Sequence, residues 1–350
     1  MKRICIVAGA RPNFVKVAPL IRAIEATEGV EYELVYTGRE DDPTLEASLF
    51  DDLQMPRPSV FFGVDSTRLN EITSMVMACF DTYLDEHPAD VVIVVDDLAS
   101  TMAAAIVTKK RGVKLAHLVA GTRSFDMNMP KEVNRLVIDA LSDYLFTAGI
   151  KSNSVATREQ AEGSNTYMVG NILMDTLRFN HQRLRQPKLD VKTGEYLVLT
   201  LNRKVLLADK EHLRMLLEAL VKTVGNMPVI APLRGQALEL VSSFQLPIHT
   251  IPSLDYLEFG WLTANAKGII TDSGNVAEEA TFNGVPCITL NSYTEHQETV
   301  SVGSNVLVDG DAQKLSEALD DLLQGRWKKC ALPDRWDGRT AERIVKILLG

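Results

Sequence analysis

A short segment near the N-terminus, Gly9-Ala10-Arg11-Pro12, has the composition of a turn that binds a phosphate. It follows the apolar run Ile4–Val7 and precedes a stretch in which apolar residues have helical spacing. Glycine permits a tight turn, proline suits the first turn of a helix, and the guanidinium of Arg11 can donate two hydrogen bonds to a phosphate. The segment lacks the GxGxxG fingerprint of dinucleotide-binding proteins. An ordinary strand-to-helix turn with a solvated arginine is the alternative.

A second candidate anion site is formed by Ser273, Gly274 and Asn275, which stand at the expected start of a helix after the apolar run Gly268–Ile270. The N-terminus of a helix presents backbone N–H groups, and the helix dipole favours an anion there. Glu279 follows about one turn later, where a carboxylate can accept hydrogen bonds from both hydroxyls of a ribose. An ordinary helix start with acidic residues would have the same composition.

Two further polar segments follow apolar runs. The segment Gly121–Arg135 is long and leads into an expected helix that carries Glu132 and Arg135 on one face. Loops in these positions are often functional, but a solvated helix start with an ion pair would look the same. Arg203 follows the run Tyr196–Thr200 and could face a diphosphate or belong to a simple basic loop.

The elements that must position these residues alternate between short apolar runs and helical patterns, in two series. Continuous apolar runs separated by helices indicate parallel strands buried on both faces, so the sequence predicts two doubly wound α/β domains. Ligands of such sheets bind at the carboxyl ends of the strands, where the candidate residues lie. The polar stretch Asn180–Glu195 is interpreted as the connector, and Arg339–Leu349 as a last helix. The expected strands are Ile4–Val7, Leu34–Tyr36, Val91–Val95, Leu115–Val119 and Tyr144–Thr147, then Tyr196–Thr200, Val229–Ala231, His249–Ile251, Gly268–Thr271, Pro286–Leu290 and Val306–Val308.

Composition excludes several classes of function. The 350 residues include 37 Lys+Arg and 46 Asp+Glu, a net charge of −9 that argues against nucleic acid as a partner. Apolar runs are strand-sized, so no membrane span is expected. The four cysteines are scattered without a CxxC pair, which argues against a zinc site and favours reduced thiols in the cytoplasm. Of the six histidines, only His296 lies in a loop where a ligand is expected, whereas His117 is expected in the core.

Taken together and in order, the motifs resemble the non-hydrolysing UDP-N-acetylglucosamine 2-epimerases of bacteria and archaea over essentially the whole chain. The resemblance rests on Gly9–Leu20, Thr37-Gly38, Ala120–Arg135, Val169–Leu177, Thr200–Arg203, Asp272–Gly284 and Thr294–Glu298. It implies a GT-B-like fold of two domains. Residues 1–178 and a C-terminal helix at about 338–350 would form one domain, and residues 179–337 would form the other. The active site would lie in the cleft that the two domains face. The resemblance also implies a cytoplasmic homodimer that needs no metal or organic cofactor. Such enzymes interconvert UDP-GlcNAc and UDP-ManNAc, a precursor of surface polysaccharides.

The same resemblance assigns roles to individual residues. The family is understood to eliminate UDP across C1–C2 and to add it back with C2 inverted, which requires carboxylates as base and acid and cationic groups for the diphosphate. By position, Asp97 and Glu132 would be the catalytic carboxylates. The UDP-sugar would be held by Arg11, Asn202, Arg203, Ser273, Gly274, Asn275, Glu279 and His296, with Glu279 on the ribose.

The chain departs from the family at catalytic positions. Val119 replaces a catalytic glutamate, and Asn202 replaces a catalytic histidine. Loss of one acid–base group typically lowers a rate by about 10²–10⁴-fold. The alternative is therefore a catalytically impaired relative that binds a nucleotide-sugar as a regulator or scaffold, and a GT-B transferase is a more distant third. Further departures near the active site are Asp96 and Leu98 on either side of Asp97, Lys131, Asn275 and His296-Gln297. Arg39-Glu40 and Arg234 replace residues of the neighbouring allosteric site of bacterial members, so allosteric activation by UDP-GlcNAc is not expected.

Overall fold

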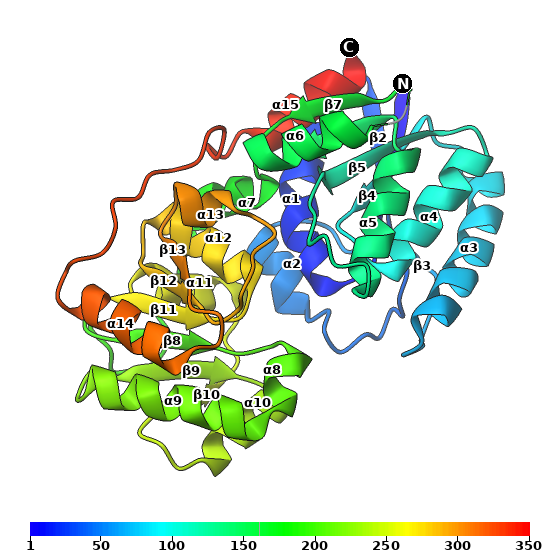
Figure 1. Ribbon diagram of the computed structural model, residues 1–350. Coiled ribbons are helices and arrows are strands. Elements are labelled where there is room, and N and C mark those ends of the chain that lie inside the picture. Colours follow the sequence, from blue (N-terminus) through cyan, green and yellow to red (C-terminus); the bar gives the residue numbers. More distant parts are fainter. Residues whose placement is uncertain (161) are drawn as a thin grey trace. The chain divides into compact units, whose positions relative to one another are not determined.

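The computed structural model describes residues 1–160 and 162–350, which form two compact units (Figure 1). Unit 1 contains Met1–Phe179 and Asp334–Gly350, and unit 2 contains Asn180–Pro333. Each unit is built on one sheet of parallel strands with helices between them. The prediction of two doubly wound α/β sheets is therefore confirmed.

Unit 1 has a seven-stranded sheet in the order β3-β2-β1-β4-β5-β6-β7. Each strand pairs in parallel with its neighbours, so the carboxyl ends of all the strands meet at one edge. The strands are β1 (Lys2–Ala8), β2 (Val30–Tyr36), β3 (Val60–Phe61), β4 (Val91–Val95), β5 (Lys114–Ala120), β6 (Tyr144–Thr147) and β7 (Asn165–Met168). The helices are α1 (Arg11–Glu25), α2 (Ala47–Leu53), α3 (Leu69–Glu86), α4 (Ala99–Lys110), α5 (Pro130–Leu141), α6 (Ile150–Glu159), α7 (Ile172–Asn180) and α15 (Thr340–Leu349).

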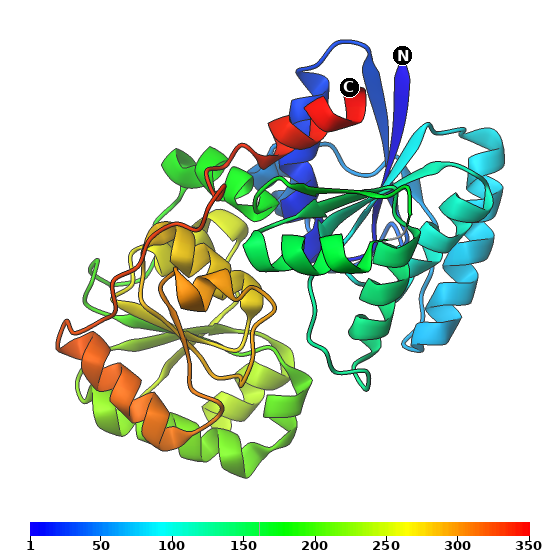
Figure 2. The same cartoon turned by 45° about the horizontal axis from the view of Figure 1, so that its top comes forward.

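Helices cover both faces of this sheet. Figure 2 shows α1 and α15 on the opposite side of the sheet from α3 and α4. All five residues of β4 are buried, as a strand covered on both faces requires. The register between β5 and β6 shifts between Leu118 and Ala120, so the end of β5 is bulged at Val119. This irregularity lies at the carboxyl end of the strand, at the sheet edge where the sequence places the candidate residues.

The last segment of the chain belongs to unit 1, and two buried polar contacts hold it there. The indole of Trp336, which is buried, donates a hydrogen bond to the carbonyl of Ala148 (3.0 Å). The carboxylate of Asp175 accepts the backbone N–H groups of Thr340 (3.1 Å) and Ala341 (2.8 Å), the first residues of α15. Asp175 therefore satisfies N–H groups that a helix leaves without an internal acceptor.

Unit 2 has a six-stranded parallel sheet in the order β10-β9-β8-β11-β12-β13. Its strands are β8 (Leu197–Thr200), β9 (Val229–Leu233), β10 (His249–Pro252), β11 (Gly268–Thr271), β12 (Cys287–Thr289) and β13 (Asn305–Leu307). Its helices are the 3₁₀ turn η1 (His181–Arg183), α8 (Lys204–Ala208), α9 (Lys210–Val224), α10 (Gly235–Ser243), α11 (Tyr256–Ala264), α12 (Gly274–Asn283), α13 (Glu298–Ser301) and α14 (Ala312–Leu323). The strands β8, β11 and β12 are neighbours, so residues that follow them share one sheet edge.

Candidate active site

In unit 1, the predicted catalytic carboxylates Asp97 and Glu132 lie together, because both contact Arg135. Asp97 is the second residue after β4, and Glu132 is in the first turn of α5. Arg135 donates to the Asp97 carboxylate from Nε (2.8 Å) and Nη2 (2.6 Å), and its Nη1 lies 3.1 Å from Oε2 of Glu132. The arginine side chain is only 5% exposed. The expected Glu132–Arg135 pair therefore exists, but it is buried rather than solvated.

A second cation, Lys131, also contacts Asp97. Its Nζ lies 3.1 Å from Oδ1 of Asp97, and its side chain is 56% exposed, whereas the aspartate side chain is 12% exposed. Burial alone would raise the pKa of Asp97, but the charges of Lys131 and Arg135 outweigh burial and lower it. Asp97 is therefore ionised and held between two cations.

Glu132 anchors the loop that precedes α5. Its Oε2 accepts hydrogen bonds from the backbone N–H (2.8 Å) and the hydroxyl (2.9 Å) of Ser124, and its Oε1 accepts from the N–H of Phe125 (3.1 Å). Burial raises the pKa of Glu132, but these donors and Arg135 lower it overall. Phe125 itself has a φ of 60° and an exposed side chain. The carboxylate thus points into the loop, an orientation that the sequence spacing did not indicate.

Asp96 forms a separate ion pair next to Asp97. Its carboxylate accepts hydrogen bonds from Lys16 Nζ (2.6 Å) and from the side-chain amide of Asn13 (2.8 Å), both on α1. Asp96 has a φ of 59°, a left-handed conformation that is uncommon for a residue other than glycine. Sequence reasoning missed Lys16, because nothing in its helical context indicates a partner 80 positions away.

Buried His117 holds the backbone of Asp96 by a hydrogen bond to its carbonyl. Its Nε2 donates to the Asp96 carbonyl (3.0 Å), and its Nδ1 faces the carboxylate of Asp139 (2.6 Å). A backbone carbonyl can only accept, so Nε2 is the donor in its contact with Asp96. Burial raises the pKa of Asp139, but His117 and Arg123 together lower it. The histidine is therefore a core residue, as predicted, and it also positions the turn that carries Asp96 and Asp97.

Val119, at the position of the missing catalytic glutamate, has a strained backbone. Its φ is 74°, in the region that L-residues with a branched Cβ strongly disfavour. The neighbouring Gly121 has a φ of 75°, and a Cβ there would lie 2.1 Å from the carbonyl oxygen of Ser152. The side chain of Val119 is half-buried and has no group that transfers a proton. The bulge at the end of β5 is therefore present without the carboxylate that the family resemblance implies at its tip.

Arg11, the other candidate in unit 1, is the first residue of α1 and follows β1. Its Nη2 lies 3.7 Å from Oε2 of Glu46, the residue that directly precedes α2 in the sequence. Since β1 and β4 are neighbours, Arg11 and Asp97 follow adjacent strands. Its guanidinium is nonetheless directed toward Glu46, whereas Asp97 is paired with Lys131 and Arg135.

In unit 2, the predicted diphosphate residues gather around Asp272. Its buried carboxylate accepts the backbone N–H groups of Asn202 (2.8 Å) and Arg203 (2.7 Å), and its carbonyl accepts from Nε of Arg203 (2.9 Å). Burial raises the pKa of Asp272. Ser273, Gly274 and Asn275 follow at the start of α12, with Ser273 as the N-cap residue. Arg203 and the amide-rich helix start are thus held at the ends of the neighbouring strands β8 and β11.

Glu278, Glu279 and His296 form a second group in this unit. Burial, followed by the charge of Glu278, raises the pKa of Glu279 to about 8. The Nε2 of His296 lies 3.3 Å from Oε1 of Glu278. The structure therefore directs His296 to Glu278 and buries Glu279, where a hydrogen-bond donor would favour the ionised form of Glu279.

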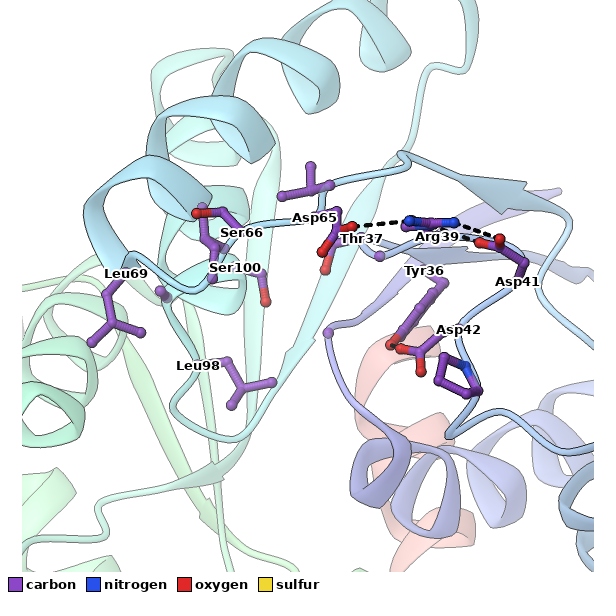
Figure 3. A pocket seen from close by; sticks show the side chains of 16 residues that line it. Tyr36, Thr37, Arg39, Asp41, Asp42, Asp65, Ser66, Leu69, Leu98 and Ser100 are labelled. Atoms are coloured by element: carbon purple, nitrogen blue, oxygen red, sulfur yellow. Dashed lines mark hydrogen bonds and ion pairs between the residues drawn. The ribbon is translucent and has the colours of Figure 1, made fainter. Parts of the chain in front are cut away.

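A cavity of about 470 Å³ lies within unit 1, at the carboxyl ends of β1 and β2 (Figure 3). Asp41 and Asp65 hold the guanidinium of Arg39 at 2.5 and 3.0 Å, and the hydroxyl of Tyr36 donates to Asp42 (2.7 Å). Three aspartates and one arginine make this lining unfavourable for a diphosphate.

The described residues contain neither a metal-binding cluster nor a membrane-spanning helix. Within residues 1–160 and 162–350, no group of three or more His, Cys, Asp or Glu side chains is placed to hold a metal ion. In the same part of the chain, every helix is too short or too polar to cross a bilayer.

Comparisons with solved structures define the class of the fold. The chain is similar to the UDP-GlcNAc 2-epimerase of Methanocaldococcus jannaschii in complex with UDP-GlcNAc and UDP, with a TM-score of 0.87, 31% identity and 99% of each chain covered. The structure of the Neisseria meningitidis enzyme bound to UDP-GlcNAc, at 22% identity and with full coverage of both chains, has a similar fold (TM-score 0.88). The chain thus has the GT-B-like architecture of these neighbours.

Comparisons of sequence define the family. The family described as UDP-N-acetylglucosamine 2-epimerase matches residues 22–349. The M. jannaschii enzyme of that name is 32% identical over 366 residues, which are 99% of this chain and 98% of the relative. The UDP-2,3-diacetamido-2,3-dideoxy-D-glucuronate 2-epimerase of Pseudomonas aeruginosa is 32% identical over 322 residues, 90% of this chain and 91% of the relative. The chain belongs to the UDP-N-acetylglucosamine 2-epimerase family.

Proposed function

We propose that the protein binds a UDP-N-acetylhexosamine and inverts its C2 centre. The observation that carries this proposal is the group at the ends of β8 and β11, where Arg203 and the start of α12 are fixed by Asp272. A cation beside a helix N-terminus is suited to a diphosphate. In the M. jannaschii relative, a chain of similar fold is solved with UDP-GlcNAc and UDP.

The proposed reaction is an elimination followed by re-addition. In the first stage, the C2 proton passes to a base, the bond between C1 and the diphosphate oxygen breaks, and UDP departs, so that a 2-acetamidoglucal is formed. In the second stage, UDP adds back to C1 and C2 is protonated from the other face, which completes the inversion. Asp97 and Glu132, which share Arg135, are the proposed acid–base groups, and Glu279 holds the ribose. Arg11, Arg203, Ser273, Gly274 and Asn275 contact the diphosphate, with Asn202 and His296 beside them.

The sugar is the finer part of the proposal. UDP-GlcNAc and UDP-ManNAc are the first substrates to test, because the M. jannaschii relative carries the name UDP-N-acetylglucosamine 2-epimerase. The name of the P. aeruginosa relative makes a diacetamido uronate the next candidate. From the family resemblance we also propose a cytoplasmic homodimer that supplies precursors for surface polysaccharides.

A second candidate function is binding without turnover, as a regulator or scaffold. The observation in its favour is that the carboxylates near Val119 are already paired: Asp96 with Lys16, and Asp97 and Glu132 with Arg135. Ion pairing with Arg135 stabilises the ionised carboxylates of Asp97 and Glu132 and so weakens them as bases. A half-buried valine replaces the remaining acid–base group.

Proton NMR of UDP-GlcNAc incubated with the protein in D₂O tests these alternatives. Deuterium at C2 together with UDP-ManNAc signals is the result that the epimerase proposal predicts. Free UDP with free ManNAc would identify a hydrolysing variant. An unchanged spectrum with broadened ligand lines would refute turnover and support the binding function, and sharp, unchanged lines would refute both. Sedimentation velocity of the same sample tests the homodimer.

A further inference from the structure

We infer that Tyr293 is a further diphosphate-binding residue, an inference that rests on the proposed binding of a UDP-sugar. Tyr293 lies in the segment that follows β12, and β12 is the neighbour of β11. Arg203 follows β8, and α12 begins after β11. Three neighbouring parallel strands thus bring the tyrosine, the helix start and the arginine to one sheet edge.

Direct contacts join Tyr293 to this group. Nη1 of Arg203 donates to the hydroxyl of Tyr293 (2.9 Å), and the Arg203 Cζ atom lies 5.2 Å from the centre of the tyrosine ring. Arg203 is held in turn by the carbonyl of Asp272, which also accepts the side-chain amide of Asn291 (3.0 Å) from the tyrosine's own segment. The carbonyl of Asp272 therefore ties the segment that follows β12 to the turn that opens α12.

The chemistry of a phenol suits it to an anion at this place. A phenol oxygen can accept one hydrogen bond while its O–H donates another. The guanidinium of Arg203 donates to this oxygen, and its positive charge strengthens the O–H as a donor. A diphosphate offers only acceptor oxygens near neutral pH. It would meet the O–H of Tyr293, the guanidinium of Arg203 and the backbone N–H groups at the start of α12 together.

Two residues beside Arg203 increase the importance of a contact between Tyr293 and the diphosphate. Asn202, where the family resemblance implies a histidine, provides an uncharged amide. Glu295 competes for the same cation, since its Oε2 lies 3.8 Å from Nη2 of Arg203. The diphosphate must therefore compete with a carboxylate for Arg203, without the imidazole that the family places nearby. A hydroxyl donor from the adjacent strand end supplies an additional contact.

The test compares Tyr293→Phe with Tyr32→Phe, a control that also removes one phenol hydrogen bond, to Glu25 (2.8 Å) in unit 1. UDP binding to the wild type and both variants is measured by isothermal titration calorimetry, and uridine binding by saturation-transfer NMR. Loss of a hydrogen bond to a charged group lowers affinity by about tenfold or more. We expect Tyr293→Phe to weaken UDP binding by that factor and to leave uridine binding unchanged, with Tyr32→Phe equal to the wild type.

Each other outcome has one meaning. Equal UDP affinity of Tyr293→Phe and the wild type would overturn the inference and leave the proposed function standing. Parallel loss of UDP and uridine binding would also overturn it, because a general disturbance of the site would then explain the effect. A wild type that binds no UDP would refute the proposed function itself, and this inference with it.

Discussion

Replacing Glu132 by glutamine separates a proton-transfer role from an anchoring role. A glutamine side chain has one carbonyl oxygen and one NH₂ group, and the NH₂ group cannot accept a hydrogen bond. In its best placement, the glutamine carbonyl takes the position of Oε2 and still accepts the hydrogen bonds from Ser124 and Arg135. The NH₂ group then takes the position of Oε1 and faces the N–H of Phe125. The variant thus has two donors facing each other and loses the negative charge opposite buried Arg135.

These losses set the magnitude. An unsatisfied buried donor costs about 1–3 kcal/mol, and removing one partner of a buried ion pair costs about 3–5 kcal/mol. The retained carbonyl keeps part of the contacts, so we expect Glu132→Gln to lower the free energy of unfolding of unit 1 by about 3 kcal/mol. With a urea dependence of about 3 kcal/mol per molar, the midpoint falls by about 1 M.

Trp336 reports on this unit because its indole is buried in unit 1, whereas Trp261 and Trp327 lie in unit 2. Urea unfolding is therefore followed by tryptophan fluorescence in a background carrying Trp261→Phe and Trp327→Phe. Lys131→Gln serves as the control. Its ion pair with Asp97 involves a 56% exposed side chain, so its loss costs about 1 kcal/mol or less.

The pH dependence gives a second reading of the same variant. The pKa of Glu132 is lowered in the folded protein, so its ionised form stabilises the fold. This contribution is complete above the ordinary glutamate pKa of about 4.3 and is lost as the pH falls through the folded value. The difference between wild type and variant must then shrink below about pH 4. An unchanged urea midpoint at neutral pH, together with a loss of turnover, would refute the anchoring role.

Three further changes test other parts of the structure. Val119→Gly removes a branched residue from a left-handed conformation, so we expect unit 1 to gain about 1 kcal/mol of stability, measured by the same fluorescence assay; a loss would show that the valine side chain contributes more by packing than its backbone costs. Asp175→Ala removes the acceptor for two N–H groups at the start of α15 and should destabilise that helix by about 1–2 kcal/mol, seen as faster proteolysis after residue 333. Val119→Glu combined with Asn202→His restores the family's acid–base groups and should raise turnover of UDP-GlcNAc by about 10²-fold or more, and no gain would show that the remaining site has diverged beyond these two residues.

The parts of the fold that sequence patterns predict are those in which burial dictates residue type. The run Val91–Val95 is apolar throughout because a parallel strand is covered on both faces, and it is β4 in the structure. The missed strands, Val60–Phe61 and Asn165–Met168, lie at the two edges of the sheet, where one strand has two residues and the other is half polar. An edge position does not require a continuous apolar run, so periodicity does not reveal it.

The candidate site divides in the same way. Strand ends predict where Arg203 and Ser273 lie, because the chain must turn there and a helix must begin. Side-chain direction is set by contacts between distant segments. The pairing of Asp96 with Lys16 and the turn of Glu132 toward Ser124 depend on how α1, β4 and α5 pack together. No spacing in the sequence encodes these contacts, which decide which carboxylates can still act as a base.

Asp97 can act as a base only if one of its ion pairs is weakened. Each unit by which a pKa is lowered removes about 1.4 kcal/mol of proton affinity, and the two cations beside Asp97 act in that direction. Arg135 cannot leave easily, because it is buried and shared with Glu132. Lys131 can, because its side chain is long and more than half exposed. Release of Lys131 would free the Oδ1 oxygen of Asp97 to act as a base. An epimerase with Val119 in place of the catalytic glutamate would therefore depend on the release of Lys131 from Asp97.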